Sequence, residues 1–471
     1  MALISPVELE PLDRLGPVHF IAVGGAGMSG IAEAYASAGI PVSGSDRDDS
    51  DTLAELATAG VRTFVGHDAA QLGAAQTVVV SSAITPDNPE LAAARNHGLR
   101  VWHRSAALGA LMLGRVGIAI SGTHGKTTTT GMVATLLTEL GQDPGYVIGS
   151  PLAATGRRAA LGHGPFVVEA DESDGSFLQY PAQIVVVTNI EADHLDNWGT
   201  AAAYEEGFVT LGSAPDVSTV IMNADEPRSR EVAAQLRERG KTVITVGEGA
   251  DADIRISDVQ LGPGLTAATL SADGDTGPLT LMVPGRFNLT NAAAAYAVGR
   301  ALDLPGPQVR EALGRFAGTY RRFEFRGEAD GVRVFDDYAH HPTEVAAILT
   351  AARESVPAGG RLVACFQPHL FSRTRDFEEA FAEALTLADE VVIVGIYPAR
   401  EAAEDFPGVT ASHLGARAAA HGVRAVVVED LAQVPATLAA LVRSGDLVLT
   451  IGAGAVTVVG PALVGLLKER G

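Results

Sequence analysis

The chain has 471 residues, enough for about three domains, and it combines 53 glycines with an aromatic content of only 5%, a mix that favours helices packed on sheets. Its formal net charge is −22, without a block of Lys and Arg, which argues against binding to the phosphate backbone of nucleic acids. Cys365 is the single cysteine, so an intrachain disulfide is impossible and a disulfide-stabilised extracellular protein is excluded.

The two ends of the chain give no sign of export or membrane insertion. The first residues, MALISPVELEP, contain two glutamates and no basic residue, so we expect no signal peptide. The late apolar run AVTVVGPALVGLL is interrupted by Gly and Pro and is shorter than the ~20 residues of a spanning helix. By elimination we expect a cytoplasmic protein that does not insert into membranes.

Short β-branched runs, each followed by a polar or glycine-rich turn and an Ala/Leu-rich segment, recur along the chain. The runs interpreted as strands lie at 18–23, 77–83, 117–120, 166–170, 184–190, 333–338, 362–367, 390–397, 424–430 and 446–452. This alternation predicts parallel sheets with crossover helices. The segment 250–285, with LGPGLT and ADGDTGPL, is instead typical of β-hairpins and predicts a small antiparallel appendix.

Two boundaries are expected, near residues 105–116 and 317–332, where a helix is followed by a new strand. We therefore predict an α/β protein of three domains. Residues 1–112 and 321–471 would each be Rossmann-like, and residues 113–320 would form a central domain with a phosphate-binding loop and the antiparallel appendix.

The first glycine-rich motif is GAGMSG, which fits G-x-G-x-x-G between a predicted strand and a predicted helix. Asp46 follows 21 residues after the first glycine, as in dinucleotide-binding βαβ units. Glycines there let the backbone approach phosphate, and the helix N-terminus supplies amides. The alternative is a tight packing turn. The residues predicted to bind phosphate are Gly25, Ala26, Gly27, Met28, Ser29 and Gly30.

The second motif is GIAISGTHGKTTTT at 117–130. The spacing G-x-x-x-x-G-K-[ST] would require glycine at Ile120, but the upstream glycine is Gly122. The phosphate-binding groups are nevertheless retained. Backbone amides can still point at phosphate oxygens, Lys126 supplies a positive charge, and Thr127 supplies a hydroxyl for Mg²⁺. The alternative is a glycine-rich turn with a surface lysine.

Two acidic segments follow the strands at 166–170 and 184–190, namely EADESD and EADHLD. Ligands of open α/β sheets bind beyond the carboxyl ends of the strands, and Mg²⁺ prefers oxygen ligands. We therefore expect a nucleotide–metal site here, with Glu169 as a ligand. Asp171, Glu172 and Asp174 are either further ligands or solvated loop acids.

The strings SGTHGKTTTTGM, VEADESDGSFL and VTNIEADHLD resemble the Mur ligase family of peptidoglycan synthesis. GGAGMSGIAE and FDDYAHHPTEV extend the resemblance, which runs in order from about residue 18 to LTIGAGAV near the C-terminus. In that family the shortened loop is the ATP site. The resemblance implies that ATP phosphorylates the lactyl carboxylate of UDP-N-acetylmuramate, and that the amine of L-alanine attacks the acyl phosphate.

The resemblance also implies roles for individual residues. Lys126 would hold the transferred phosphoryl group, Thr127 and Glu169 one Mg²⁺, and His194 a second Mg²⁺; the alternative for His194 is a packed or surface histidine. Residues 25–30 would hold the UDP diphosphate, with Asp46 and 81–84 nearby. The residues implied for ATP binding are Gly122, Thr123, His124, Gly125, Lys126, Thr127, Thr128, Asn288, Asn291, Arg322 and Asp337.

For L-alanine the resemblance implies Tyr338, His340 and Arg373, the last as a clamp on the α-carboxylate. The chain departs from the family pattern at Leu370, where a second arginine is frequent, and at Phe287, where histidine is usual. Arg375 either compensates for Leu370 or lies at the surface, and Arg321 is a weaker candidate than Arg322.

Three other functions stay open. A nicotinamide-dependent oxidoreductase would explain GAGMSG and Asp46 but would leave Lys126 and both acidic segments unused. A related ligase that attaches a recycled tripeptide to the same UDP-sugar is a closer alternative. The third is a binding module that uses ATP as a switch.

Overall fold

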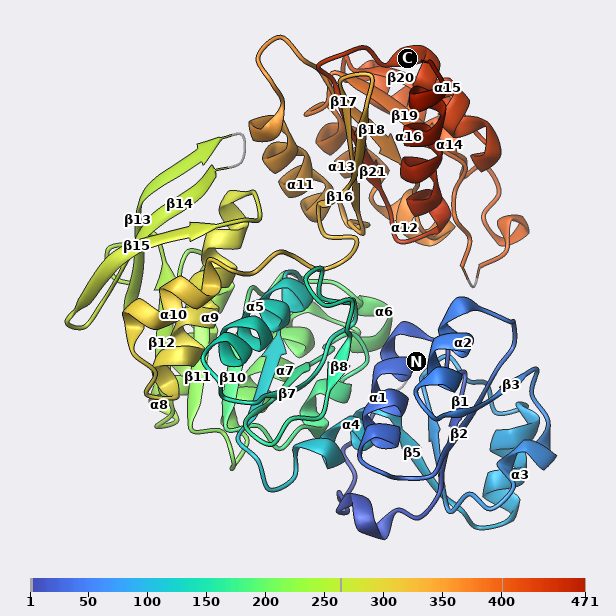
Figure 1. Ribbon diagram of the computed structural model, residues 1–471, viewed down its shortest axis with the longest axis vertical. Coiled ribbons are helices and arrows are strands. Elements are labelled where there is room, and N and C mark those ends of the chain that lie inside the picture. The colour runs from blue at the N-terminus through green and yellow to red at the C-terminus, as the bar shows by residue number, and fades with distance from the viewer. Residues whose placement is uncertain (1–2, 263–264, 400, 471) are drawn as a thin grey trace. The chain divides into compact units, whose positions relative to one another are not determined.

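The computed structural model describes residues 3–262, 265–399 and 401–470, which form three sheets and divide into two compact units (Figure 1). The first unit contains Met1–Ser257, Thr269–Leu279 and Thr290–Phe316. The second contains Asp258–Ala268, Thr280–Leu289 and Ala317–Gly471.

In the described N-terminal part, five parallel strands have the order β3-β2-β1-β4-β5. The strands are β1 (Val18–Ile21), β2 (Val42–Asp46), β3 (Arg62–Val65), β4 (Thr77–Val80) and β5 (Arg100–His103). The helices are α1 (Ala26–Ser37), α2 (Asp51–Thr58), α3 (Pro89–Asn96) and α4 (Arg104–Met112), with 3₁₀ turns η1 (Leu12–Arg14) and η2 (Ala69–Leu72). Because the strand order reverses between β1 and β4, the loop after β1 opens at the switch point where such sheets bind ligands.

The central sheet has the order β15-β14-β13-β12-β11-β10-β6-β9-β7-β8 among the described residues. Its strands are β6 (Gly117–Ser121), β7 (Gly145–Val147), β8 (Ala159–Ala160), β9 (Phe166–Glu169), β10 (Ile184–Val187), β11 (Thr219–Asn223), β12 (Thr242–Gly247), β13 (Ile254–Gly262), β14 (Leu265–Ala272) and β15 (Asp275–Leu281). The sheet is mixed, since β7 and β8 are antiparallel. β6 pairs in parallel with both β9 and β10, so the carboxyl ends of these three strands meet at one edge.

The helices that accompany the central sheet include one that starts directly after the second glycine motif. They are α5 (Lys126–Glu139), α6 (Leu195–Trp198), α7 (Ala201–Ser213), α8 (Pro227–Glu238), α9 (Arg286–Ala301) and α10 (Gly306–Leu313), with the 3₁₀ turn η3 (Ser176–Gln179). β13, β14 and β15 occupy the segment that was predicted as hairpins; Pro263 and Gly264 of the quoted string LGPGLT lie outside the described residues.

The C-terminal sheet has the order β16-β17-β21-β18-β19-β20 in the described chain, parallel except for the pair β16–β17. Its strands are β16 (Glu324–Ala329), β17 (Val332–Asp337), β18 (Leu362–Phe366), β19 (Glu390–Val394), β20 (Arg424–Val428) and β21 (Leu447–Ile451). The helices are α11 (Pro342–Ser355), α12 (Phe371–Asp376), α13 (Glu378–Leu385), α14 (Ala411–Ala420), α15 (Val434–Leu441) and α16 (Val459–Arg470), with η4 (Ala403–Asp405), η5 (Leu431–Gln433) and η6 (Ala455–Val458).

Successive residues of β18 point into two different cores. Ala364 and Phe366 pack with residues of α11, α13 and α14, whereas Val363 and Cys365 pack with residues of α15 and α16. Both faces of the strand are therefore covered, which explains why its sequence is a continuous apolar run rather than an alternating one.

The predicted fold class, α/β with three domains and Rossmann-like first and last domains, is confirmed. The predicted strands all occur, although several end two or three residues earlier than predicted, as at 184–190, where β10 ends at Val187. The domain limits 1–112, 113–320 and 321–471 stay a prediction. No described helix combines the length and apolarity that a membrane crossing requires.

A buried ion pair in the C-terminal sheet gives a test of stability. Asp446 is fully buried and accepts hydrogen bonds from Arg361 Nη2 (2.7 Å) and from the backbone N–H of Arg443 (3.0 Å). Asp446→Asn removes the carboxylate that accepts from Arg361 and leaves Glu390 (3.1 Å) as its remaining ion-pair partner, so we expect a loss of about 3 kcal/mol and a melting temperature about 6–12 °C lower by scanning calorimetry. Asp376→Asn, which breaks an exposed pair with Arg375, should leave the melting temperature nearly unchanged, because solvent screens such a pair. Equal shifts for both variants would contradict this expectation.

Candidate functional site

The second glycine motif forms the loop between β6 and α5, and two of its glycines are required by their surroundings. Gly122 has φ 122°, and a Cβ there would lie 2.2 Å from Thr188 Oγ1. Gly125 has φ 84°, and a Cβ there would lie 2.8 Å from Asn291 Oδ1. Ile120, by contrast, is a fully buried residue of β6. The turn therefore starts after the strand, and glycine at position 120 is not needed.

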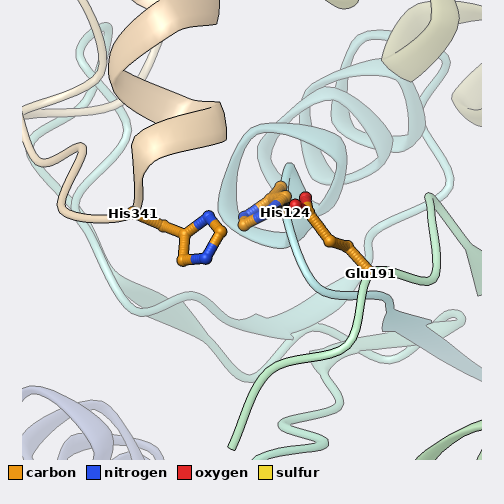
Figure 2. A group of neighbouring side chains, drawn as sticks. All are labelled: His124, Glu191 and His341. Atoms are coloured by element: carbon orange, nitrogen blue, oxygen red, sulfur yellow. Dashed lines mark hydrogen bonds and ion pairs between the residues drawn. The ribbon is translucent and has the colours of Figure 1, made fainter. Parts of the chain in front are cut away.

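Hydrogen bonds join this loop to the segment that follows β10. Thr123 Oγ1 donates to the carbonyl of Glu191 (2.9 Å), and the N–H of His124 donates to Asn189 Oδ1 (2.9 Å). The imidazole of His124 lies beside the carboxylate of Glu191, with Nε2 at 2.9 Å from Oε2 (Figure 2). Figure 2 also draws His341, which belongs to the other unit. The loop is thus held in shape by the first residues of the second acidic segment.

Lys126 is held by a buried carboxylate that the sequence did not single out. Its Nζ donates to the carbonyls of Gly122 (2.6 Å) and Thr123 (2.9 Å) and lies 2.7 Å from Glu172 Oε2. The two side chains are 18% and 1% exposed. Burial alone would lower the pKa of Lys126, but the carboxylates of Glu172 and Asp171 outweigh it and the pKa is raised. Lys126 is therefore a charged ammonium at the mouth of the loop.

Thr127 and Glu169 also lie together, as the predicted magnesium site requires. Thr127 Oγ1 donates to Glu169 Oε2 (3.1 Å), and the N–H of Gly149 donates to Oε1 (2.7 Å). A hydroxyl and a carboxylate at this distance are oxygen donors of the kind that Mg²⁺ takes beside a phosphate, so these residues fit the ion. His194 begins α6 in a left-handed conformation, and its Nε2 lies 3.5 Å from Asp193 Oδ2. Its role as a second ligand stays a prediction.

Each carboxylate of the segment Glu169–Asp174 has its own partner. The pairs are Glu169 with Thr127, Asp171 with Arg104 (2.6 Å), Glu172 with Lys126, and Asp174 with Ser82 (2.6 Å). Burial by itself raises the pKa of Asp171, but Arg104 and Lys126 reverse this and hold it well below its usual range. These acids organise positive charge and hydroxyl groups around the loop.

The first glycine motif forms the turn between β1 and α1. Asp46 faces this turn, because its Oδ2 accepts a hydrogen bond from the N–H of Gly24 (2.9 Å). Ser29 Oγ accepts a hydrogen bond from Arg158 Nη1 (3.1 Å), and Gly27 lies against Arg104. Met28, a residue of the predicted set, buries its side chain in the core.

The two arginines at this loop were missed by the sequence analysis. Arg158 belongs to no motif, and nothing in the sequence indicates it. Arg104 follows β5 directly, so the rule that ligands bind beyond strand ends could have indicated it.

The remaining residues predicted for ATP lie on α5, on α9 and in the second unit. Thr128 is buried in the first turn of α5, and Asn291 faces Gly125. Asn288 is buried and donates to the carbonyl of Pro284 (2.7 Å), whereas Phe287, one residue earlier, is exposed.

Arg322 and Asp337 gather with Tyr338 in the second unit. The carboxylate of Asp337 accepts the N–H groups of Phe323 and Ala339, both at 2.8 Å. Burial raises the pKa of Asp337 to about 6, with Arg322 opposing the shift, and the guanidinium of Arg322 lies 5.4 Å from the Tyr338 ring centre. Arg321 also lies over the Tyr338 ring (4.9 Å), and its guanidinium contacts Asp336 (3.3 Å) and the carbonyl of Gly454 (3.2 Å).

The predicted alanine residues form part of an aromatic cluster. The rings of Tyr338 and His340 lie 5.4 Å apart, His340 and His369 5.9 Å, and His369 and Tyr397 5.8 Å. Burial lowers the pKa of His340 to about 4; Glu344 opposes this and Arg373 adds to it. His369 and Tyr397 were not predicted, although His369 stands in the quoted string FQPHLFSRTRD.

Leu370 and Arg375 flank Arg373 on either side. Leu370 precedes α12, is buried and has φ 67°, which is unusual for a branched side chain. Arg375 is exposed, pairs with Asp376 (2.7 Å) and lies over Phe406 (5.6 Å), so its contacts favour a surface position over compensation for Leu370.

The lowered pKa of His340 predicts how the stability of the fold depends on pH. A depressed pKa in the folded state means that neutral His340 stabilises the fold above pH 6.5, and that this contribution is lost as the pH falls toward and through 4. His340→Gln should therefore show a smaller loss of unfolding free energy between pH 7 and 4 than the parent chain, by about 2–3 kcal/mol. Thermal melts across this range measure it. His97→Gln, at an exposed histidine after α3, should match the parent; parallel curves for all three proteins would refute the prediction.

The similarity to known proteins extends over the whole chain. Three family models match: Mur ligase family, catalytic domain, over residues 17–115; Mur ligase middle domain over 120–299; and Mur ligase, glutamate ligase domain, over 321–454. A UDP-N-acetylmuramate–L-alanine ligase of Cutibacterium acnes is 57% identical over 100% of both chains. One of Thermobifida fusca is 49% identical over 98% of this chain and 99% of its own.

Solved structures match over the same length. A crystal structure of UDP-N-acetylmuramate–alanine ligase from Thermotoga maritima has a TM-score of 0.82 and 28% identity, covering 97% of this chain and 100% of its own. A murein peptide ligase from Psychrobacter arcticus has a TM-score of 0.70 at 24% identity, covering 96% and 99%, and this likeness concerns the fold alone.

Proposed function

The chain belongs to the Mur ligase family, and on this premise we propose that it joins L-alanine to UDP-N-acetylmuramate in an ATP-dependent reaction of cytoplasmic peptidoglycan precursor synthesis. The observation that carries the ATP-dependent step is the loop at 122–127, where Lys126 is paired with buried Glu172 and Thr127 lies beside Glu169. The relatives named above support the choice of substrates.

The proposed reaction has two steps. An oxygen of the lactyl carboxylate attacks the γ-phosphorus of ATP, and the bond to the bridging oxygen breaks, so that ADP leaves and an acyl phosphate forms. The amine of L-alanine then attacks the acyl carbon, and phosphate leaves from the tetrahedral intermediate with loss of a proton from nitrogen. Both partners of the first step are anions, so the site must neutralise charge and hold the reacting atoms in line.

Lys126 and the loop amides would perform most of that neutralisation. Lys126 enters the reaction already charged and already confined, because Glu172 and two carbonyls accept the three hydrogen bonds that its ammonium can donate. A phosphate oxygen would take the place of one of these acceptors. Confinement of a long side chain before binding lowers the entropy lost when phosphate arrives. Thr127 and Glu169 would hold Mg²⁺, with His194 at a second ion, and the metal would supply further positive charge to the phosphate oxygens.

The acceptor would be bound by the second unit. Arg373 would hold the α-carboxylate of L-alanine, with Tyr338 and His340 beside it, and Asn288, Asn291, Arg322 and Asp337 would contact the nucleotide. The low pKa of His340 supports a neutral imidazole at pH 7, which adds no positive charge near the ammonium of the incoming amino acid. The residues at 25–30 would hold the diphosphate of the UDP-sugar.

A ligase for a recycled peptide is the second candidate, favoured by one observation. Leu370 stands where the family often carries a second arginine, so the residues proposed to bind the acceptor differ from the family pattern at this position. The full-length identity of 57% to an alanine ligase outweighs this single difference.

Release of ADP tests the proposal. With UDP-N-acetylmuramate, ATP and Mg²⁺ present, we expect ADP only when L-alanine is added, and Lys126→Ala should reduce the rate at least about a thousandfold, because the developing phosphoryl charge loses its cation. Lys241→Ala is the matched control, since Lys241 also donates to two carbonyls, of Ala214 and Val217, away from the loop. Full turnover by Lys126→Ala would exclude the role assigned to this lysine.

The choice of acceptor needs its own assay. L-alanine should support ADP release at least about tenfold faster than the tripeptide at equal concentration, because Arg373 would hold a free α-carboxylate beside the attacking amine, and in the tripeptide that carboxyl group is part of an amide. Faster release with the tripeptide would favour the recycling ligase.

A further inference from the structure

We propose that Arg104 binds the diphosphate of the UDP-sugar and, through Asp171, ties that diphosphate to the ATP-binding loop. The proposal rests on the proposed function and adds a residue that belongs to neither glycine motif. Arg104 is the first residue of α4, directly after β5, so its backbone is placed at the ligand-binding edge of the N-terminal sheet.

The guanidinium of Arg104 lies against the glycine at which the first loop would come closest to phosphate. A Cβ on Gly27 would lie 3.1 Å from Nη1 and 3.4 Å from Cζ of Arg104. The middle glycine of G-x-G-x-x-G is the position where the backbone approaches a diphosphate. A phosphate seated on this turn would therefore be within reach of Nη1.

Asp171 holds Arg104 from the other side and leaves donors available. Asp171 Oδ2 accepts from Nη2 at 2.6 Å, and within the described chain this is the hydrogen bond that the Arg104 guanidinium makes. An arginine has five N–H donors in a planar fork, so one edge can hold the carboxylate while another binds phosphate. The Arg104 side chain is 18% exposed, so it is shielded from bulk water but still reachable by a ligand.

The position of Asp171 gives this contact a second consequence. Asp171 and Glu172 are consecutive, and they hold Arg104 and Lys126, respectively. The two cations assigned to the two phosphate-bearing substrates are thus fixed to adjacent residues of one segment after β9. The segment sets their separation, and with it the distance between the UDP-sugar and the γ-phosphate of ATP.

Calorimetry on the full-length chain separates these roles. The variants are Arg104→Gln, Asp171→Asn and Arg100→Gln, the last at an arginine four residues earlier that pairs with Glu10. The probes are UDP, UDP-N-acetylmuramate, UMP and ADP. Arg104→Gln should raise the Kd of UDP and of UDP-N-acetylmuramate about 10- to 100-fold, because a charge-assisted hydrogen bond to the second phosphate is lost. The Kd of UMP should rise less, and that of ADP should stay within about twofold of the parent value.

Asp171→Asn distinguishes binding from mere support of the fold. It removes the ion pair but keeps the guanidinium, so the Kd of UDP should stay within about threefold of the parent value. A loss of UDP affinity as large as that of Arg104→Gln would mean that Arg104 acts only through its salt bridge. If Arg104→Gln weakened the binding of UDP-N-acetylmuramate but not that of UDP, Arg104 would contact the lactyl carboxylate of the sugar rather than the diphosphate, and the assignment would be overturned. Unchanged binding of all probes, or equal losses in Arg100→Gln, would also overturn it. If the parent binds ADP but no uridine nucleotide, the proposed function itself fails.

Discussion

The parallel pairing of β9, β6 and β10 is the constraint on which the rest of the candidate site depends. Three strands that run side by side in one direction release their chains at one edge, so a glycine loop and two acidic segments from distant parts of the sequence come into contact. The hydrogen bonds of Thr123 and His124 to the segment after β10, and the ion pair of Lys126 with the segment after β9, are consequences of this order. A different strand order would leave the same motifs apart.

This arrangement also explains how a chain with 56 acidic and 34 basic residues would accommodate the anionic substrates proposed for it. Excess carboxylates near a phosphate site would repel the ligand if they were free. Here Glu172 and Asp171 pair with the cations Lys126 and Arg104, and Glu169 and Asp174 accept hydrogen bonds from Thr127 and Ser82. The acids therefore serve to orient cations and hydroxyls, and the local field at the loop is not the field that the net charge suggests.

The sequence predicted the features that depend on neighbours along the chain. β-branched runs gave the strands, and glycines followed by Lys126 and Thr127 gave the loop, because turn geometry and helix start are local properties. It could not assign the partners of Glu172 and Arg104, because Lys126 and Asp171 are distant from them in sequence and only the strand order brings each pair together. The sequence motif also left open whether Ile120, in place of glycine, disrupts the loop. The structure answers this because β6 extends to Ser121, and a motif does not indicate where a strand ends.

Cys365 lies in the middle of β18, between two helical layers, and its burial raises the pKa of the thiol. A thiol that is both covered and protonated reacts slowly with alkylating reagents while the fold is intact. Cysteines introduced at exposed positions of the two units would therefore carry spectroscopic labels selectively, without removal of the natural residue. The chain is suited as it stands to measurements by resonance energy transfer or spin labels of the distance between its two units with and without ligands.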